Sequence, residues 1–365
     1  MSPFPREAYL PLTPYAPDRR PIEIDLSDNT NRWGAHPDAL AVVREADPDE
    51  LIRYPSVYAD ALRDAIARRH GVPGSAVATG CGSDDLLDSG FRAICEPGER
   101  VAFIPPTFSM IEIFAQMNAL EAVPVGDGVG SLPTPAELIE AVGGPGSRGL
   151  IYLCRPNNPT GEVQPRAWVD ALIDEVGPRG PVIFIDEAYA DYADESFLER
   201  AAGSERVVVL RTLSKVYGLA GLRVGFAVGA PQVIAEIEKS RGPYKVNRLA
   251  ERAAVAALDD ADGWIPTIVR QTREERAYLM QALTDRGLRP LDSGANFILV
   301  PLADGQDTHT VTAGLREGGV AVRPFPALPG LGDCIRVSIG PREELDRFLA
   351  ELDPILDPSQ TGTNR

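Results

Sequence analysis

The segment GLIYLCRPNNPTG, residues 149–161, decides the fold class, because an unbroken apolar run leads into a turn of asparagine, proline and glycine. A strand that is apolar throughout is typical of a sheet buried on both faces. Helical patterns such as residues 109–120 and 166–176 separate further runs of this kind. These runs are residues 76–82, 100–106, 121–125, 181–186, 206–212 and 222–229. The alternation predicts an α/β domain with a mostly parallel sheet over about residues 45–245.

The C-terminal third has a different pattern. A long charged helix is predicted over residues 263–287, and helices at 309–319 and 341–352 follow it. Short apolar strands are predicted at residues 295–300, 320–325 and 334–340. We therefore expect a smaller α+β domain, built from both chain ends, residues 1–44 and 246–365.

Composition excludes several classes of function. The 365 residues carry 36 Lys and Arg against 53 Asp and Glu, a net charge of −17, which disfavours binding to nucleic acid. No apolar run approaches the roughly 18 residues of a membrane span, and the N-terminus lacks the basic start of a secretory signal. We expect a cytoplasmic protein without membrane contact. Four cysteines and three histidines lie without metal-ligand spacing, so neither a metal nor a disulfide is expected.

The residues that follow the strands carry the chemistry, because ligands of open α/β sheets lie beyond the carboxyl ends of the strands. Taken singly, each has a structural explanation: NNPTG is a good turn, Asp186 and GSDD could cap helices, Phe108 could be core, and most lysines are solvated. Lys215, however, lies among small residues at the mouth of a buried sheet. Lost hydration would lower the pKa of its amine and let it condense with a carbonyl.

Four motifs together identify a family. In chain order, GSDD (82–85), NNPTG (157–161), DEAY (186–189) and SKVYGLAGLRVG (214–225) resemble the pyridoxal-phosphate-dependent aminotransferases of fold type I. Within that family RYP, RTLSK, PYKVN, ANFILV and IRVSIG are most similar to the histidinol-phosphate aminotransferases. The resemblance implies a three-layer sandwich, pyridoxal 5'-phosphate as cofactor, and a homodimer with shared active sites. Its substrates would be an amine donor and a 2-oxo acid, here histidinol phosphate and 2-oxoglutarate in histidine biosynthesis.

The resemblance assigns the residues around the cofactor ring. Lys215 matches the lysine that binds the cofactor aldehyde and then moves the substrate proton, and Asp186 matches the carboxylate that keeps the ring nitrogen protonated. Asn158 and Tyr189 match the two donors to the phenolic oxygen. Phe108 stands where an aromatic ring, commonly tyrosine, stacks on the pyridine. Lys215, Asp186 and Tyr189 are thus the catalytic candidates.

The cofactor phosphate has its own set of candidates. Arg223, eight positions after Lys215, resembles the arginine that clamps the phosphate, and the GSDD turn would open a helix whose first amides favour an anion. Tyr54 resembles the tyrosine that reaches the cofactor phosphate of the neighbouring subunit. The other predicted contacts of the phosphate are Gly82, Ser83, Asp84, Thr212 and Ser214.

Substrate recognition is predicted at the small domain. Arg336 resembles the arginine that binds the α-carboxylate of ordinary substrates. The further substrate-binding candidates are Tyr54, Asn158, Tyr244, Asn247 and Arg323. Two segments depart from the family pattern: NTNRW (29–33) stands where N-E-N-P is frequent, and PYKVN carries Lys245 where asparagine or serine is usual.

Three alternatives stay open on the sequence. An aromatic amino-acid aminotransferase would share every cofactor residue and differ only in the side-chain pocket. A threonine-phosphate decarboxylase would be expected to carry a glutamate-rich turn in place of GSDD. A binding protein that kept the fold without catalysis is disfavoured by the intact Lys215 and Asp186.

Overall fold

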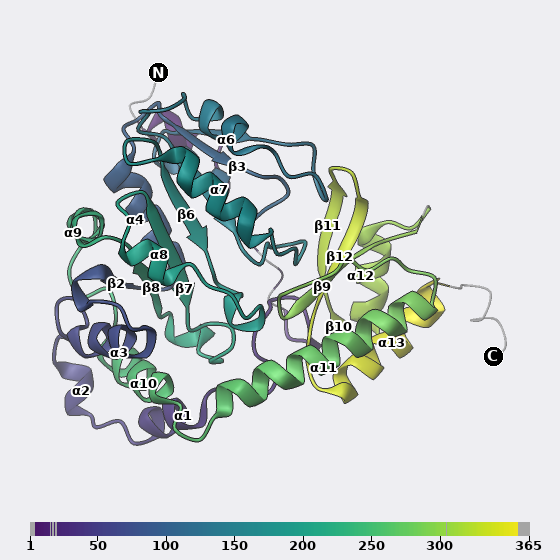
Figure 1. The fold of residues 1–365 in the computed structure, drawn as a ribbon. Coiled ribbons are helices and arrows are strands. Elements are labelled where there is room, and N and C mark those ends of the chain that lie inside the picture. The colour runs from purple at the N-terminus through teal and green to yellow at the C-terminus, as the bar shows by residue number, and fades with distance from the viewer. Residues whose placement is uncertain (1–3, 15, 17, 19, 304, 357–365) are drawn as a thin grey trace.

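The computed structural model describes residues 4–14, 16, 18, 20–303 and 305–356, and a seven-stranded sheet forms the centre of its larger part (Figure 1). All neighbouring strands pair in parallel except β8, which runs antiparallel to both of its neighbours. The mostly parallel sheet predicted from the apolar runs is confirmed. In spatial order the strands are β2 (Val77–Gly80), β8 (Gly225–Val228), β7 (Val207–Thr212), β6 (Val182–Asp186), β5 (Leu150–Cys154), β3 (Arg100–Phe103) and β4 (Glu121–Pro124).

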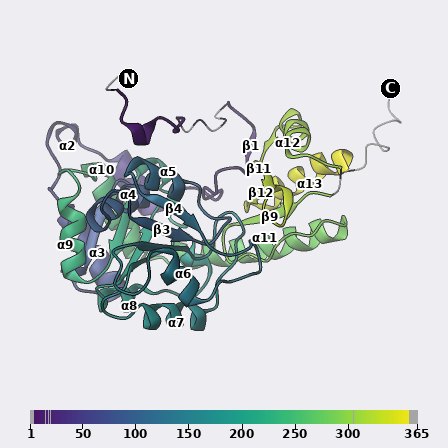
Figure 2. The same ribbon diagram turned by 90° about the horizontal axis from the view of Figure 1, so that it is seen from above.

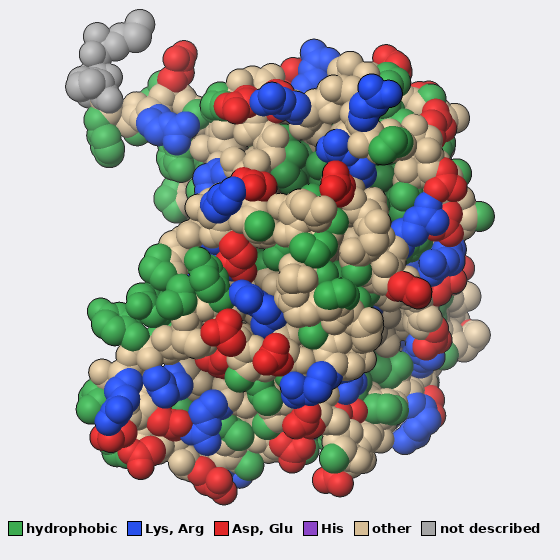
Figure 3. All heavy atoms as spheres, turned by 60° about the vertical axis from the view of Figure 1, so that its left-hand side comes forward, with side chains coloured by type: hydrophobic (Ala, Val, Ile, Leu, Met, Phe, Trp, Pro, Cys, Tyr) green, Lys and Arg blue, Asp and Glu red, His purple; other side chains and the backbone are tan. Residues whose placement is uncertain are grey.

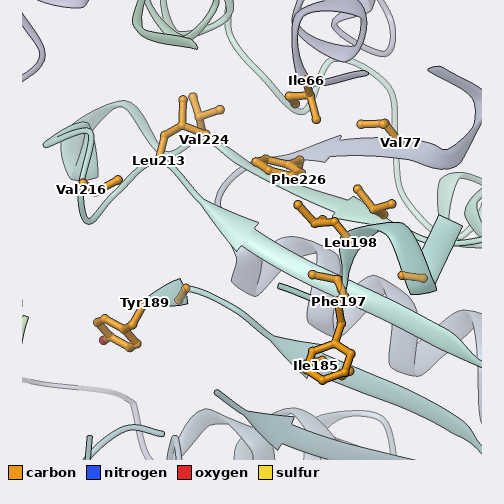
Figure 4. Close-up of a cluster of buried hydrophobic side chains, with 14 of the residues drawn as sticks. Ile66, Val77, Ile185, Tyr189, Phe197, Leu198, Leu213, Val216, Val224 and Phe226 are labelled. Carbon is orange, nitrogen blue, oxygen red and sulfur yellow. The ribbon is translucent and has the colours of Figure 1, made fainter. Parts of the chain in front are cut away.

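Helices cover both faces of this sheet, and β6 shows why its sequence is continuously apolar. Val182 and Phe184 pack into the core on one face, whereas Ile183 and Ile185 pack into the core on the other, part of which Figure 4 shows. The three-layer sandwich is therefore confirmed. The first face carries α4 (Ser83–Ile94), α5 (Met110–Met117) and α9 (Pro231–Lys239); the second carries α3 (Asp60–His70), α6 (Pro135–Ala141), α7 (Arg166–Val176), α8 (Leu198–Ala202) and α10 (Arg248–Asp259).

A smaller α+β domain lies at the other end of the long helix α11 (Trp264–Asp285) (Figure 1). Its antiparallel sheet has the order β11-β12-β9, and the N-terminal strand β1 pairs in parallel with β10. The N-terminal segment thus lies beside C-terminal elements. The elements are β1 (Ile24–Asp25), β9 (Phe297–Pro301), β10 (Val320–Ala321), β11 (Arg323–Leu328), β12 (Gly332–Ser338), α12 (Thr308–Glu317) and α13 (Arg342–Leu356).

Shorter elements complete the chain. Figure 2 shows α2 at the edge of the large sheet's helices, opposite the small domain. None of the helices in the described ranges is both long and apolar enough to cross a membrane. The short elements are α1 (Pro37–Arg44), α2 (Asp49–Ile52) and the 3₁₀ turns Glu7–Tyr9, Gly74–Ala76, Ala190–Tyr192 and Ala220–Leu222.

Candidate active site

Strand register gathers the predicted residues at one edge of the large sheet. Cys154 of β5 lies opposite Asp186 of β6, and Asp186 lies opposite Leu210 of β7. The segments that follow these parallel strands therefore leave the sheet side by side. They carry Asn158, Asp186 with Tyr189, and Thr212 through Lys215.

Lys215 is partly buried in this edge. Its Nζ donates to the carbonyl of Asp28 at 3.4 Å and lies 5.6 Å from the centre of the Tyr189 ring. Burial and, to a smaller extent, the nearby Arg336 charge lower the pKa of the Lys215 amine to about 8, against the opposing effect of Asp84. Roughly a tenth of the amine is consequently neutral at pH 7, and this neutral form can act as a nucleophile or proton acceptor.

Asp186 ends β6 as a buried carboxylate with a donor on each oxygen. The Tyr152 hydroxyl donates to Oδ2 at 2.8 Å, and the Ala188 amide donates to Oδ1 at 3.0 Å. Burial raises the pKa of Asp186 to about 6, while both donors favour the charged form. The carboxylate is therefore mainly ionised at neutral pH. Tyr152 was not predicted, because a tyrosine in an apolar strand gives only the signal of a core residue.

A hydrogen bond from the N-terminal segment fixes the position of Tyr189. Its hydroxyl accepts from Nδ2 of Asn29 at 3.0 Å, and its ring meets Phe297 edge-to-face at 5.1 Å. Burial raises the pKa of Tyr189, so the hydroxyl keeps its own proton. Asn29 is anchored in turn, since its backbone amide donates to Ser338 Oγ at 2.9 Å. Asn29 is a second residue that the sequence reasoning missed, although it opens the NTNRW segment.

Arg223, Ser214 and the start of α4 form a pocket suited to an anion. Nη1 of Arg223 lies 3.3 Å from Ser214 Oγ, and Nη2 lies 3.4 Å from an oxygen of Asp84. The residue before α4 is Gly82, so no side chain caps the first amides of the helix. Gly82 has a φ of +81°, which favours glycine, and a Cβ added there would lie 2.4 Å from Arg223 Nη2 and displace the guanidinium. Thr212 joins the group through a 2.9 Å bond to Ser214.

Arg336 of β12 reaches Asn158 across the domain boundary. Nη1 donates to Asn158 Oδ1 at 2.6 Å, and Nη2 donates to the carbonyl of Ser27 at 2.7 Å. The rings of Phe297 and Phe325 lie 5.2 and 5.5 Å from the guanidinium carbon. The structure thus brings Asn158 and Arg336 together, with the planar fork of the arginine fixed in one orientation.

The other predicted substrate contacts divide into two groups. Arg323 of β11 lies directly opposite Arg336 in the β11–β12 ladder, so both arginines belong to one face of the small sheet. Tyr54 and Tyr244 instead stack on each other at 4.9 Å, and Tyr54 is 79% exposed. Asn247 caps α10 by accepting from the Ala250 amide. In the described ranges no recorded bond or ring contact joins Tyr54, Tyr244 or Asn247 to Lys215 or Asp186.

Phe108, and the charged residues Lys245 and Arg32 that depart from the family pattern, each have identifiable neighbours. Phe108 is partly buried and packs beside the core on the α4 face. Nζ of Lys245 lies 3.2 Å from an oxygen of Asp85. Arg32, in the NTNRW segment, pairs with Glu344 at 2.6 Å. Carboxylates of this chain therefore neutralise both added charges.

A cavity adjoins the site at Asn157 and Gly161 of the NNPTG turn. This cavity of about 670 Å³ opens where the Gly294 amide donates to the Gly161 carbonyl, and Arg276 lines it, but Lys215 and Asp186 do not. Within the described ranges, no group of three or more His, Cys, Asp or Glu side chains is placed to hold a metal ion.

Comparison with known proteins gives consistent matches over almost the whole chain. The family profile for aminotransferase class I and II matches residues 21–352. A histidinol-phosphate aminotransferase of Roseiflexus castenholzii is 36% identical over 366 residues, covering 96% of this chain and 95% of that protein. Another, of Moorella thermoacetica, is 34% identical over 369 residues, covering 96% and 92%. The crystal structure of histidinol-phosphate aminotransferase from Sinorhizobium meliloti in complex with pyridoxal-5'-phosphate has a TM-score of 0.83 and 27% identity, covering 93% and 92% of the two chains.

Proposed function

Because the chain belongs to the aminotransferase class I and II family, we propose that it uses pyridoxal 5'-phosphate to transfer the amino group of histidinol phosphate to 2-oxoglutarate. The observation that carries the reaction class is one juxtaposition. The Lys215 amine has a pKa lowered to about 8. It follows β7 at the edge of the sheet where the buried carboxylate of Asp186 ends β6. The substrate rests on the names of relatives at 34% and 36% identity.

The residues fit this cofactor. The pocket beside Gly82 combines a guanidinium, hydroxyls and an uncapped helix start, which together suit a phosphate dianion. Asp186 presents an ionised carboxylate with an acceptor position left on each oxygen, which suits a protonated ring nitrogen. When bound, pyridoxal phosphate supplies an aldehyde that takes up the amino group and a ring that withdraws electrons from the substrate's Cα.

The side chains then divide the work. We expect the neutral Lys215 amine to take a proton from the substrate Cα and to return it to the neighbouring carbon of the cofactor. Asp186 would hold a proton on the ring nitrogen by its negative charge. Tyr189, which accepts from Asn29 and keeps its own proton, would donate to the phenolic oxygen. Arg223 would bind the phosphate and so fix the ring relative to Lys215.

Arg336 and Arg323 support the choice of substrates. Both substrates carry an anionic group, a carboxylate or a phosphate, and the two arginines are neighbours on one face of the small sheet. A guanidinium binds either group through two parallel hydrogen bonds. We propose that Arg336 binds the α-carboxylate of the acceptor and that Arg323 contributes to the substrate phosphate.

We further propose a homodimer in which Tyr54, Tyr244 and Asn247 complete the partner's site. Leu51 and Ile52 of α2 are 72% and 77% exposed, beside the exposed Tyr54. Figure 3, which brings forward the side that carries α2 in Figure 1, shows apolar side chains gathered on this face. Large exposed apolar groups of this kind mark protein contacts. The cytoplasmic location stays a prediction from the sequence.

A substrate panel tests the proposal. The purified protein is loaded with pyridoxal phosphate, and the absorbance of the bound cofactor is followed after adding histidinol phosphate, phenylalanine, tyrosine, threonine phosphate or glutamate. We expect conversion to the amino form with histidinol phosphate and glutamate, and reversal on adding 2-oxoglutarate. Preference for phenylalanine or tyrosine would instead support the aromatic aminotransferase. Release of carbon dioxide from threonine phosphate would support the decarboxylase, and no conversion by any amine would refute a transaminase.

A further inference from the structure

Tyr152 is the one hydroxyl-bearing residue of β5, and only 1% of its surface is exposed. In the parallel ladder Tyr152 lies opposite Phe184, while Cys154 lies opposite Asp186. The Tyr152 ring therefore reaches diagonally along β6, and its hydroxyl comes within 2.8 Å of Asp186 Oδ2. The rest of the ring packs in the apolar core on the α4 face.

The proton of this hydrogen bond belongs to the tyrosine. Burial and the Asp186 charge raise the pKa of the Tyr152 hydroxyl well above its ordinary value, so it stays protonated and donates. The Ala188 amide occupies the other oxygen of the carboxylate at 3.0 Å. Two donors on two oxygens fix the plane of the carboxylate. Burial disfavours the charged form of Asp186, and the Tyr152 bond opposes that effect.

We propose that Tyr152 is a positioning residue whose hydroxyl keeps the Asp186 carboxylate ionised and oriented toward the protonated ring nitrogen of pyridoxal phosphate. This inference rests on the proposed function, which assigns Asp186 to that nitrogen. Packing alone does not explain the hydroxyl, because a phenylalanine ring would fill nearly the same volume without a polar group to bury. The hydroxyl donates to Asp186 at 2.8 Å, and it also interacts with the thiol of the neighbouring Cys154.

Tyr152→Phe isolates the hydroxyl. Since a hydrogen bond to a charged group contributes more than a neutral one, we expect the Asp186 titration to move upward by about one pH unit or more. The carboxyl carbons of apoprotein labelled with ¹³C-aspartate report this titration by NMR, and the Asp186 signal is assigned by its loss in Asp186→Asn. We also expect the dissociation constant of pyridoxal phosphate at pH 7 to rise roughly tenfold.

A matched variant separates this role from general packing. Tyr192 is also buried, at 2% exposure, but it packs in the core on the opposite face of the sheet. Tyr192→Phe should leave both the Asp186 titration and the affinity for pyridoxal phosphate unchanged. Equal effects of Tyr192→Phe and Tyr152→Phe would overturn the inference, because they would report a general loosening of the core.

A double-variant cycle completes the test. In an Asp186→Asn background, Tyr152→Phe should change the affinity for pyridoxal phosphate by less than about twofold, because Tyr152 acts through the charge of Asp186. The same loss in both backgrounds would overturn the inference. Failure of the wild-type protein to bind pyridoxal phosphate would refute the proposed function. Normal binding with an unchanged Asp186 titration in Tyr152→Phe would refute this inference alone.

Discussion

The amine of Lys215 should react with electrophiles far below the pH at which solvated lysines do. A pKa of about 8 leaves roughly a tenth of the amine neutral at pH 7, whereas a lysine at the ordinary value of about 10.4 is neutral in only about one molecule in 2,500. The chain holds three lysines, Lys215, Lys239 and Lys245. Competitive acetylation of the apoprotein from pH 6 to 11, followed by mass spectrometry of the digest, can therefore follow each of them separately.

The expected profile for Lys215 has its midpoint near pH 8. Lys239, whose side chain is 69% exposed, is the reference within the same chain. Because the positive charge of Arg336 contributes to the lowered pKa of Lys215, Arg336→Met should move the midpoint upward. Arg286→Met, at the distal end of α11, is the matched control and should not. A Lys215 midpoint above pH 10 would refute the reasoning, since the amine would then behave as a solvated one.

Three further substitutions test the surroundings of the site. Arg336→Lys should raise the KM for 2-oxoglutarate roughly tenfold with a smaller change in kcat, because lysine lacks the planar fork; an unchanged KM in steady-state assays would contradict this role. Asn29→Ala should lower the free energy of unfolding in urea by about 1–2 kcal/mol, since the bond to Tyr189 is lost, and an unaltered midpoint would count against that bond. Glu187→Gln should cost about 1–3 kcal/mol in the same assay, because the buried Arg211 loses its closest carboxylate but keeps that of Asp191 at 3.1 Å; an unchanged free energy of unfolding would show that the pair is dispensable.

The large sheet, and many of the site residues at its edge, could be predicted from the sequence. Every apolar run singled out for the large sheet contains one of its strands. The central strands are apolar at successive positions because they are buried on both faces, whereas the edge strand β4 is partly exposed. The register of β5, β6 and β7 then places Asp186 and Lys215 on one edge, as motifs at strand ends predict. The order in space differs from the order along the chain, because β2, which precedes GSDD, pairs with β8 and so brings the first motif beside the last.

Contacts that depend on register or on distant segments could not be predicted. The role of Tyr152 follows from which residue of β6 lies diagonal to it, and an apolar strand gives no such signal. Asn29 reaches Tyr189 from 160 positions away in the chain, through a left-handed backbone conformation with φ of 54°. The pairing of Lys245 with Asp85 could not be predicted either, because it depends on where α4 begins. The role of Tyr54 at a neighbouring subunit stays a proposal, and so do the roles of Tyr244 and Asn247 in substrate binding.

Reduction of the loaded protein tests the central claim most directly. The protein is incubated with pyridoxal phosphate and treated with borohydride, which makes the bond between amine and cofactor permanent, and the digest is then sequenced by mass spectrometry. We predict one pyridoxyl phosphate group per chain, attached to Lys215, with Lys239 and Lys245 unmodified. Attachment spread over all three lysines, or no attachment at all, would contradict the account.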